Sequence, residues 1–375
     1  MNTTDDQTPA APQGSPTLTF RGGGWIIALA GLLVALLLGW SLLGPMLGRR
    51  PIGDGRTLES YGFDLSTLLI PRETLVPSGN PRGFLPSLDG PQHLRGAEMR
   101  VYNENNRPKY VVSLDRVAGI VINGQAHAWP LSMMNVHEVV NDTVGGMPVA
   151  ATYSPLCDSV VVFDRRVGGV ERQFEVSGLL VDSNLVFYDK APAGPDAASH
   201  TPSLFVQLEF RAVSGPMAAA GATIEPLPGV CITTWQDWLA MHPETTVTLR
   251  DASMVRRMKE ISYARYFLSP RLEFPADPAP DAAKMESQGL RLKSPMVAAK
   301  IGDRWQVIPI ERKDRDLQVP WTTVIDGVSL TLSIPEGPAV ARLAREDGQP
   351  LTTVPLLYFA SEALLAPRFD ARLAP

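Results

Sequence analysis

The chain has 375 residues, of which 45% are hydrophobic and 19% charged, and its net charge is −5. This composition is typical of a folded protein with a hydrophobic core and argues against a disordered chain. Lys and Arg form no long run in the sequence, which disfavours nucleic-acid binding, because phosphate recognition needs a concentrated basic surface. The 34 prolines and 31 glycines are spread along the chain and predict a loop-rich, largely β domain.

The N-terminal part predicts a tail followed by a membrane anchor. Residues 1–20 are rich in Thr, Pro, Gln and Asp and predict a disordered tail. Within 21–48, the run Trp25–Leu43 carries no charged side chain. At about 1.5 Å per residue, such a helix spans roughly 28 Å, close to the roughly 30 Å hydrocarbon core of a bilayer. The sequence therefore predicts a single transmembrane helix, with the lipid bilayer as a partner and a single-pass membrane localisation.

A cleaved signal peptide is the alternative interpretation of this run. The run exceeds the roughly 7–15 apolar residues of a signal peptide, and no clean small-x-small cleavage site follows it. The flanking charges bear on orientation: Arg21 precedes the run, while Arg49, Arg50 and Arg56 follow it. Counted literally, the positive-inside rule then places the C-terminal body in the cytoplasm.

The rest of the chain predicts a lead-in followed by one domain. Residues 49–98 are rich in Pro and Gly and predict an extended segment, and 99–375 predict a single β-rich domain. Asp115–Leu131 and Ser294–Ile310 resemble each other, and each predicts two strands joined by a tight turn. We therefore expect two related hairpins in one continuous body, of the mainly β (α+β) class.

Further elements are predicted from apolar periodicity. Strands are expected at Val149–Tyr153, Val160–Asp164, Gln173–Val176, Leu185–Tyr188 and Thr352–Phe359. Helices are expected at Leu131–Val140, Thr234–Met241 and Ala339–Glu346. Thr234 is the expected N-cap of the second helix, since its hydroxyl can accept a hydrogen bond from the first turn. The predicted fold class is thus a β-rich domain with a few short helices, preceded by one transmembrane helix.

Three dense runs of unusual residues lie between His137 and Asp189. They read HEVVND, ATYSPLCDSVVVFDR and FEVSGLLVDSNLVFYDK, and the segments SLFVQ, TTWQDW and HPET follow them. In this order, the segments resemble the bacterial and archaeal family known as domain of unknown function 3179. The resemblance extends from about Gly62 to about Ile310 and implies a shared fold, but it brings no established activity with it.

Two departures from the family pattern affect its central segment. The family reads TYCPLC there, and its first cysteine is Ser154 in this chain, while Asp158 stands where a glycine is usual. The family's Cys-x-x-Cys beside a His-Glu pair implies a soft-metal or redox site. Only Cys157 and His137 can be carried over to that site.

A metal site can nevertheless be assembled from soft ligand types. Met133 precedes His137 by four residues, so the two side chains share one face of the expected helix. Cys157, His137 and Met133 are residue types that copper(I) favours, which predicts copper or another soft metal. The alternative is that Met133 packs in the core and His137 bonds a backbone group. Cys157 and Cys231 are the only cysteines, and whether they pair stays open.

Polar residues of the same segments predict a site for a small polar ligand. The candidates are His137, Glu138, Asp158, Asp182, Ser183 and Asn184. The alternative is that these are turn residues and strand-edge hydrogen-bond partners. A zinc protease is disfavoured, because Asn141 stands where the second histidine of HE-x-x-H would be. Ser154 lacks the Gly-x-Ser-x-Gly context of an exposed nucleophile.

These features predict a membrane-tethered binding or accessory domain with an unidentified small ligand or protein partner. Following the habit of the family, and against the arginine count, we expect the domain outside the cytoplasm. The first alternative is a hydrolytic or redox enzyme that uses the region of His137 and Cys157. The second is a structural copy whose site was lost with the change of cysteine to Ser154.

Overall fold

The computed structural model describes residues 24–46, 51–310, 320–333 and 342–373. The chain forms two compact units, Met1–Pro51 and Ile52–Pro375. The predicted tail at 1–20 lies outside the described residues.

Helix α1 (Gly24–Met46) forms where the uncharged run predicts a helix. Among the described residues, no helix combines the length and the apolar character needed to cross a membrane. The fold-class prediction is therefore wrong in its transmembrane helix, and the side of a membrane on which the domain lies stays untested.

The unit Ile52–Pro375 is β-rich, as predicted, and its larger sheets form around a central one. The central sheet has the order β2 (Leu88–Asp89), β6 (Val139–Val144), β7 (Met147–Ser154), β8 (Ser159–Asp164). A second sheet has the order β1 (Leu75–Pro77), β11 (Phe174–Val181), β12 (Asn184–Asp189), β13 (Leu204–Val206), β14 (Arg211–Ser214). A third has the order β15 (Cys231–Thr234), β4 (Arg116–Ile122), β5 (Gln125–Pro130), β16 (Thr246–Thr248), β3 (His93–Arg95).

Smaller sheets and short helices complete this unit. One sheet has the order β22 (Thr353–Leu357), β17 (Pro295–Ile301), β18 (Arg304–Pro309), β23 (Arg372–Leu373), and another is β19 (Trp321–Ile325), β20 (Val328–Ser333), β21 (Arg342–Arg345). Strands β9 (Arg166–Val167) and β10 (Val170–Glu171) pair with each other. The helices are α2 (Met99–Asn105), α3 (Leu131–Met134), α4 (Gly215–Ala219), α5 (Trp235–Met241), α6 (Val255–Glu260), α7 (Ala264–Leu268), α8 (Ala282–Ser287), α9 (Tyr358–Ala360) and α10 (Ala366–Phe369).

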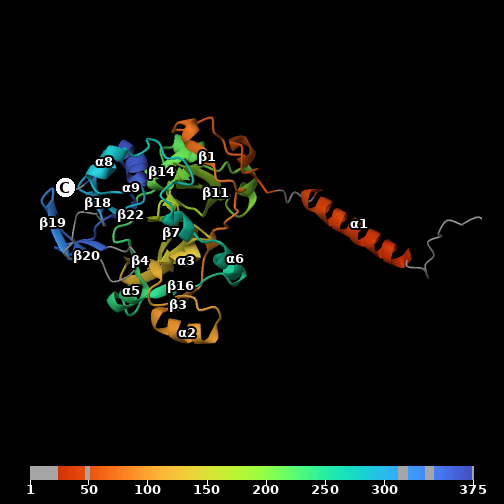
Figure 1. Cartoon of the computed structure of the whole chain (residues 1–375), viewed down its shortest axis with the longest axis horizontal. Coiled ribbons are helices and arrows are strands. Elements are labelled where there is room, and N and C mark those ends of the chain that lie inside the picture. The colour runs from red at the N-terminus through yellow and green to blue at the C-terminus, as the bar shows by residue number, and fades with distance from the viewer. Residues whose placement is uncertain (1–23, 47–50, 311–319, 334–341, 374–375) are drawn as a thin grey trace, which may run out of the picture. The chain divides into compact units, whose positions relative to one another are not determined.

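The central sheet packs on both faces, as Figure 1 indicates by the place of β7 between β11 and β16. Residues alternate across a strand, so neighbours enter opposite cores. Val161 and Phe163 of β8 pack in the core of the β11–β14 sheet, whereas Val160 and Val162 pack with Trp129 on the other side. A segment that runs along this sheet can therefore supply side chains to two separate environments.

The two predicted hairpins are confirmed. Strands β4 and β5 pair antiparallel around Asn123 and Gly124, whose φ angles of 49° and 78° are those of a tight primed turn. Strands β17 and β18 pair in the same way around Gly302 and Asp303. The hairpins belong to different sheets, because β4 pairs onward with β15 and β17 with β22.

The helix predicted over Leu131–Val140 is wrong in its second half. The helix ends at Met134, and β6 begins at Val139, where it pairs antiparallel with β7. The β-branched residues Val139 and Val140 favour a strand, and the strand pairing outweighs the apolar spacing that suggested a helix. Glu138 lies between the two elements with a positive φ of 56°.

Predictions for other elements had mixed outcomes. Thr234 does cap α5, since its side chain accepts a hydrogen bond from the backbone N–H of Asp237. The described part of the helix predicted at Ala339–Glu346 is instead strand β21, paired with β20, and its first residues lie outside the described chain. The final strand ends at Leu357, after which α9 begins. Here strand pairing again outweighed local helical propensity.

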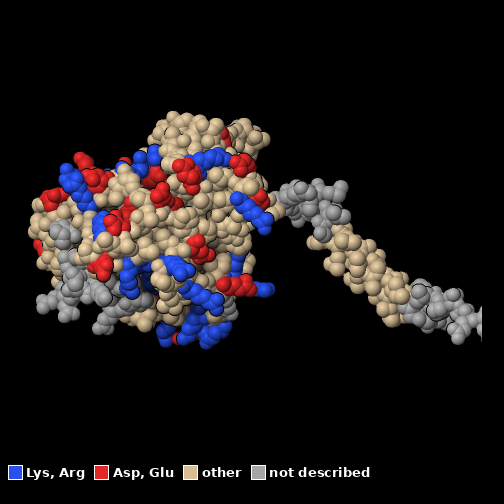
Figure 2. Space-filling view, turned by 45° about the horizontal axis from the view of Figure 1, so that its top comes forward, with Lys and Arg blue, Asp and Glu red and all other residues tan. Residues whose placement is uncertain are grey.

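The surface carries both signs of charge. On the face in Figure 2, acidic and basic side chains are interspersed, apart from a group of basic ones near its lower edge. The prediction that the protein binds no nucleic acid stays a prediction.

Candidate functional site

The segment HEVVND leads into β6, and its four polar residues enter different surroundings. Asn141 faces the β11 side, where its amide donates to Asp89 Oδ1 over 2.6 Å and to the Phe174 carbonyl over 2.8 Å. It also accepts from the Phe174 backbone N–H at 2.9 Å. Asn141 therefore joins β2 and β11 to the central sheet and acts as a structural residue.

His137 is buried and half-satisfied. Its Nδ1 lies 2.7 Å from the Pro86 carbonyl, so the Nδ1–H donates to that backbone oxygen. Burial lowers the pKa of His137, which favours the neutral ring. Nε2 is buried without a hydrogen-bond partner among the described residues. The expected alternative, a bond from His137 to the backbone, is thus present.

Glu138 lines a cavity of about 200 Å³. Most of the wall is apolar, and the lining includes Phe84, Leu85, Pro155, Leu156, Leu179 and Leu180. Burial raises the pKa of Glu138 to about 8, and the Tyr263 hydroxyl lies 3.5 Å from its Oε1. At neutral pH the cavity therefore holds a protonated carboxyl group in apolar surroundings.

Three of the family segments meet at this cavity. HEVVND supplies Glu138, the segment at the end of β7 supplies Ser154, and β11 supplies Gly178. Gly178 has a φ of +81°, and a Cβ there would lie 2.7 Å from Tyr61 Cε1 and 2.9 Å from the Asn80 carbonyl oxygen. Glycine at this position therefore lets the backbone of β11 approach the lead-in residues closely and form one wall of the cavity.

Ser154 and Cys157 lie around the turn between β7 and β8. Ser154 Oγ accepts from the Leu185 backbone N–H at 3.2 Å, and Cys157 Sγ lies 3.4 Å from the Ser183 carbonyl. Burial raises the pKa of Cys157 to about 12, so its side chain is a thiol at neutral pH and a weak nucleophile. Cys157 and Cys231 are both free cysteines.

The predicted soft-metal ligands have separate surroundings. Met133 packs in the core that contains Trp129, whereas Cys157 packs in the core of the β11–β14 sheet. Among the contacts of the described residues, none joins two of Met133, His137 and Cys157. A metal site made from these three residues stays a prediction.

Asp158, Asp182 and Ser183 make the contacts expected of turn residues. Asp158 accepts from Arg116 Nη2 at 2.8 Å and from the Tyr153 hydroxyl at 2.9 Å. Asp182 and Ser183 have φ angles of 50° and 64° and form the two-residue turn between β11 and β12. Burial raises the pKa of Asp182 to about 6, although its Oδ1 accepts from the Asp277 backbone N–H at 2.8 Å.

Asn184 belongs to a buried network around Gln207 of the SLFVQ segment. The amide of Asn184 donates to Gln207 Oε1 at 2.9 Å, and Ser159 Oγ donates to the same atom at 2.6 Å. Gln207 Nε2 donates to the Thr152 carbonyl at 3.1 Å. These bonds tie the central sheet to β12, and a ligand role for Asn184 stays a prediction.

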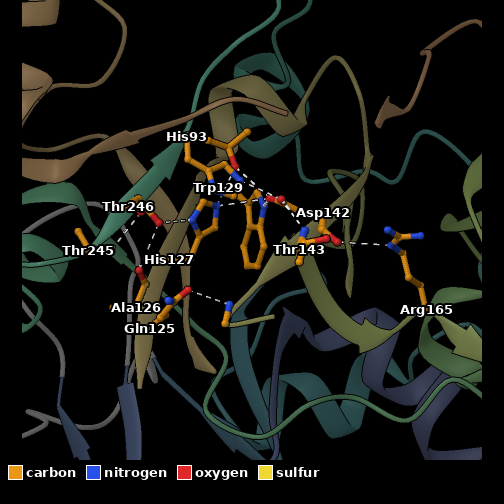
Figure 3. Close-up of polar contacts among 12 residues, drawn as sticks. His93, Gln125, Ala126, His127, Trp129, Asp142, Thr143, Arg165, Thr245 and Thr246 are labelled. Carbon is orange, nitrogen blue, oxygen red and sulfur yellow. Dashed lines mark hydrogen bonds and ion pairs between the residues drawn. The ribbon is translucent and has the colours of Figure 1, made fainter. Parts of the chain in front are cut away.

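Sequence reasoning missed a cluster formed by His93 of β3, His127 of β5 and Asp142 of β6 (Figure 3). His93 Nε2 lies 2.8 Å from Asp142 Oδ1, and His127 Nε2 lies 3.5 Å from Asp142 Oδ2. The centroids of the two imidazole rings lie 4.3 Å apart. The only signal in the sequence was the aspartate that ends HEVVND, since the two histidines lie far from it along the chain.

Asp142 is buried in a network of donors. Oδ2 accepts from Trp129 Nε1 at 2.9 Å, and Oδ1 accepts from the Thr143 backbone N–H at 2.7 Å. Burial alone would raise the pKa of Asp142, but the hydrogen bonds from His93 and from the Thr143 backbone N–H help to lower it below its usual range. For His127, burial lowers the pKa to about 3, so this ring is neutral at physiological pH.

The comparisons with known proteins agree with the resemblance. No curated protein and no solved structure matches the chain. The family model described as "Protein of unknown function (DUF3179)" matches residues 83–347, which include Glu138, most of the cavity lining and the cluster at Asp142. The chain therefore belongs to the DUF3179 family.

Proposed function

We propose that the unit Ile52–Pro375 binds a small, mainly apolar molecule that carries one neutral or cationic polar group. The observation that carries the proposal is the carboxyl group of Glu138 in the apolar wall of the cavity. Ligand pockets are typically apolar, with few polar groups that fix orientation.

The apolar wall supplies the favourable part of binding. Each Å² of apolar ligand surface removed from water contributes about 25 cal/mol. Below a pH of about 8, Glu138 is protonated and can donate one hydrogen bond and accept others. Its backbone is also held in the left-handed region at φ 56°, a conformation that non-glycine residues adopt at a cost and that clusters at functional sites.

Charge restricts the ligand class. The lining contains two carboxyl groups, those of Glu138 and Glu273, and among its described residues no Lys, Arg or His. An anion brought into this cavity would lose its hydration and meet no opposite charge. A neutral amide or alcohol can bond Glu138 directly. An amine can form an ion pair with it, and this pairing releases the proton of Glu138.

Three ligands that share an eight-carbon chain and differ only in their polar group distinguish these cases. Isothermal titration calorimetry of the full chain at pH 7 would compare octylamine, octanamide and octanoate. We expect the amine and the amide to bind and octanoate to bind at least about tenfold more weakly, a difference of about 1.4 kcal/mol. The affinity for octylamine should rise as the pH approaches 8, because the Glu138 carboxylate becomes populated.

Two variants and one control complete the test. Glu138→Gln should weaken octylamine binding about tenfold or more and change octanamide binding little. Leu180→Trp fills the cavity and should abolish binding of both. Glu98→Gln, at an exposed position, should change neither. Octanoate binding as tightly as octylamine, or unchanged octylamine binding in Glu138→Gln, would overturn the proposal.

A second candidate function is a hydrolase in which Glu138 is the general acid. It is favoured by the pKa of about 8, since proton transfer works best from a group whose pKa lies near the working pH. The thiol state of Cys157 disfavours the redox variant of the enzyme hypothesis. Hydrolysis of ethyl butyrate, whose alkoxide leaving group must take up a proton, would be measured with the full chain. Activity that is lost in Glu138→Gln and kept in Glu98→Gln would favour this candidate over simple binding.

A further inference from the structure

We propose that His93, His127 and Asp142 form a binding site for one divalent transition-metal ion. One ligand atom from each residue lies within 4.8 Å of the other two. The residues come from β3, β5 and β6, so strands of two sheets bring them together (Figure 3). The proposal uses none of the residues of the cavity at Glu138 and does not depend on the proposed function.

The spacing of the atoms suits a metal ion. Zinc lies about 2.0–2.2 Å from imidazole nitrogen and carboxylate oxygen, so two tetrahedral ligands are about 3.3 Å apart. The two nitrogen–oxygen distances in the cluster are 2.8 Å, for His93 and Asp142, and 3.5 Å, for His127 and Asp142. Shifts of about half an ångström would therefore bring each of these nitrogen–oxygen pairs to coordination spacing. The ligand atoms of all three residues lie within 4.8 Å of one another.

The surrounding contacts orient the ligands. His127 Nδ1 lies 2.7 Å from Thr246 Oγ1, so an Nδ1–H donated to this hydroxyl leaves the lone pair of Nε2 facing Asp142. Trp129 Nε1 fixes the carboxylate through its 2.9 Å bond to Oδ2. Partners of this kind hold the rings and carboxylates of metal sites in place.

One hydroxyl serves two acceptors in this arrangement. Thr248 Oγ1 lies 2.8 Å from His127 Nε2 and 3.3 Å from Asp142 Oδ2, but its single hydrogen can be donated to only one of them. With the lone pair of Nε2 facing the carboxylate, a cation between the two atoms would satisfy both. A metal ion bound by His93 as well would occupy that position.

The site would keep an open side. His93 lies on β3, the edge strand of its sheet, and its side chain is 27% exposed. His127 and Asp142 are buried. Three protein ligands leave a further coordination position for water or a ligand, as in catalytic metal sites. Two imidazoles and one carboxylate suit a first-row divalent ion such as zinc, rather than the copper(I) suggested by the sulfur-containing candidates.

Metal titration of the full chain tests the site. The protein would be stripped with a chelator and titrated with Zn²⁺ and, separately, with Co²⁺, whose visible spectrum reports coordination geometry. We expect one ion per chain and a higher unfolding temperature with Zn²⁺, because an ion that binds only the folded state stabilises it. His93→Gln should weaken binding about a hundredfold or more, a loss of about 2.7 kcal/mol.

A matched control is available in the same unit. His200 Nε2 also lies 3.5 Å from a buried carboxylate oxygen, that of Asp189, but within the described chain no third metal-ligand residue joins this pair. His200→Gln should bind Zn²⁺ like the wild type. Asp142→Asn should lose binding too, but it also disturbs the bond to Trp129. The side chain of His93 is partly exposed, so we expect His93→Gln to fold normally and to report on metal binding alone.

The proposal has two contradicting outcomes. The wild-type chain could take up no Zn²⁺ or Co²⁺ at one equivalent, in which case the cluster is a hydrogen-bond network without a metal. Alternatively, a folded His93→Gln variant, verified by circular dichroism, could bind as tightly as the wild type. Either result would overturn the assignment.

Discussion

Glu138 and Asp142 are carboxylic acids four residues apart, yet their surroundings are opposite. Glu138 meets an apolar cavity wall and one hydroxyl at 3.5 Å, and burial raises its pKa to about 8. Asp142 meets four close donors on β3, β5, β6 and β16, and its pKa is lowered. Burial penalises both charges, but only Asp142 has the hydrogen bonds that offset the penalty. One short segment thereby supplies a neutral acid to one site and a carboxylate to another.

The opposite surroundings of Asp142 and Glu138 indicate different roles for the two residues. The Asp142 carboxylate is held by partners that would be left unsatisfied without it, so it contributes to stability as well as to the proposed metal site. Glu138 has few partners, and its ionisation costs stability. Such a cost is typical of groups kept for binding or catalysis.

The largest expected effect is the loss of stability in Asp142→Ala. Removing the carboxylate leaves Trp129 Nε1 and the Thr143 N–H without their partner, and we expect the free energy of unfolding to fall by about 4 kcal/mol. Glu138→Ala should cost about 1 kcal/mol or less. Urea unfolding of both variants measures the difference. A larger loss in Glu138→Ala would reverse the comparison.

A smaller effect is expected at the wall of the cavity. Gly178→Ala places a Cβ 2.7 Å from Tyr61 at a φ of +81°, and we expect a loss of about 3 kcal/mol. Gly124→Ala is the matched control, because Gly124 also has a positive φ, of +78°, but open space around it. It should cost about 1 kcal/mol. Equal losses in the two variants would mean that the wall at Gly178 is loosely packed.

The pH dependence of stability should differ between the two acids. The folded-state pKa of Glu138 lies above its unfolded value, so Glu138 makes the folded state less stable as pH rises from about 4.5 to about 8. Glu138→Gln should therefore be more stable than wild type by about 2 kcal/mol at pH 6, by more at pH 8, and nearly equal to it at pH 4. The folded-state pKa of Asp142 is lowered, so its contribution is lost only as pH falls through that value. A Glu138→Gln advantage that is independent of pH would contradict the raised pKa.

The smallest effect is expected at Ser154, where the family pattern has cysteine. Ser154→Ala removes the acceptor of the Leu185 N–H bond, and we expect a loss of about 1 kcal/mol by urea unfolding. Because Ser154 lines the cavity, octanamide binding should change less than threefold. Complete loss of binding in a folded Ser154→Ala variant would make Ser154 a binding residue in its own right.

The sequence predicted the local features better than the distant ones. Asn123-Gly124 specified its hairpin through its own φ preferences, and Thr234 capped α5 through a contact three residues away. Glu138 was singled out as a candidate ligand residue, but the cavity around it was not foreseen. The predicted helix at Leu131–Val140 failed because pairing with β7, a tertiary contact, decides the conformation of Val139 and Val140.

The histidine cluster could not be predicted in the same way. His93 and His127 are close because β16 pairs parallel with β5 and antiparallel with β3, and Asp142 comes from β6 of the central sheet. No short-range pattern encodes this arrangement. The polar residues Asn184 and Gln207 were visible as motif residues, but their role in a buried network depends on the packing of two sheets. The predicted transmembrane helix failed in the opposite way. A local apolar run suggested a membrane span, but no helix among the described residues is long and apolar enough to form one.

The protonation state of Glu138 is the most direct test of the contrast. Infrared difference spectroscopy of the full chain against Glu138→Gln would detect the C=O stretch of a protonated carboxyl group. We expect this band to be present at pH 6.5, absent from Glu138→Gln, and lost as the pH is raised through about 8. A Glu138 carboxyl group that is already ionised at pH 6.5 would contradict the proposed difference between Glu138 and Asp142.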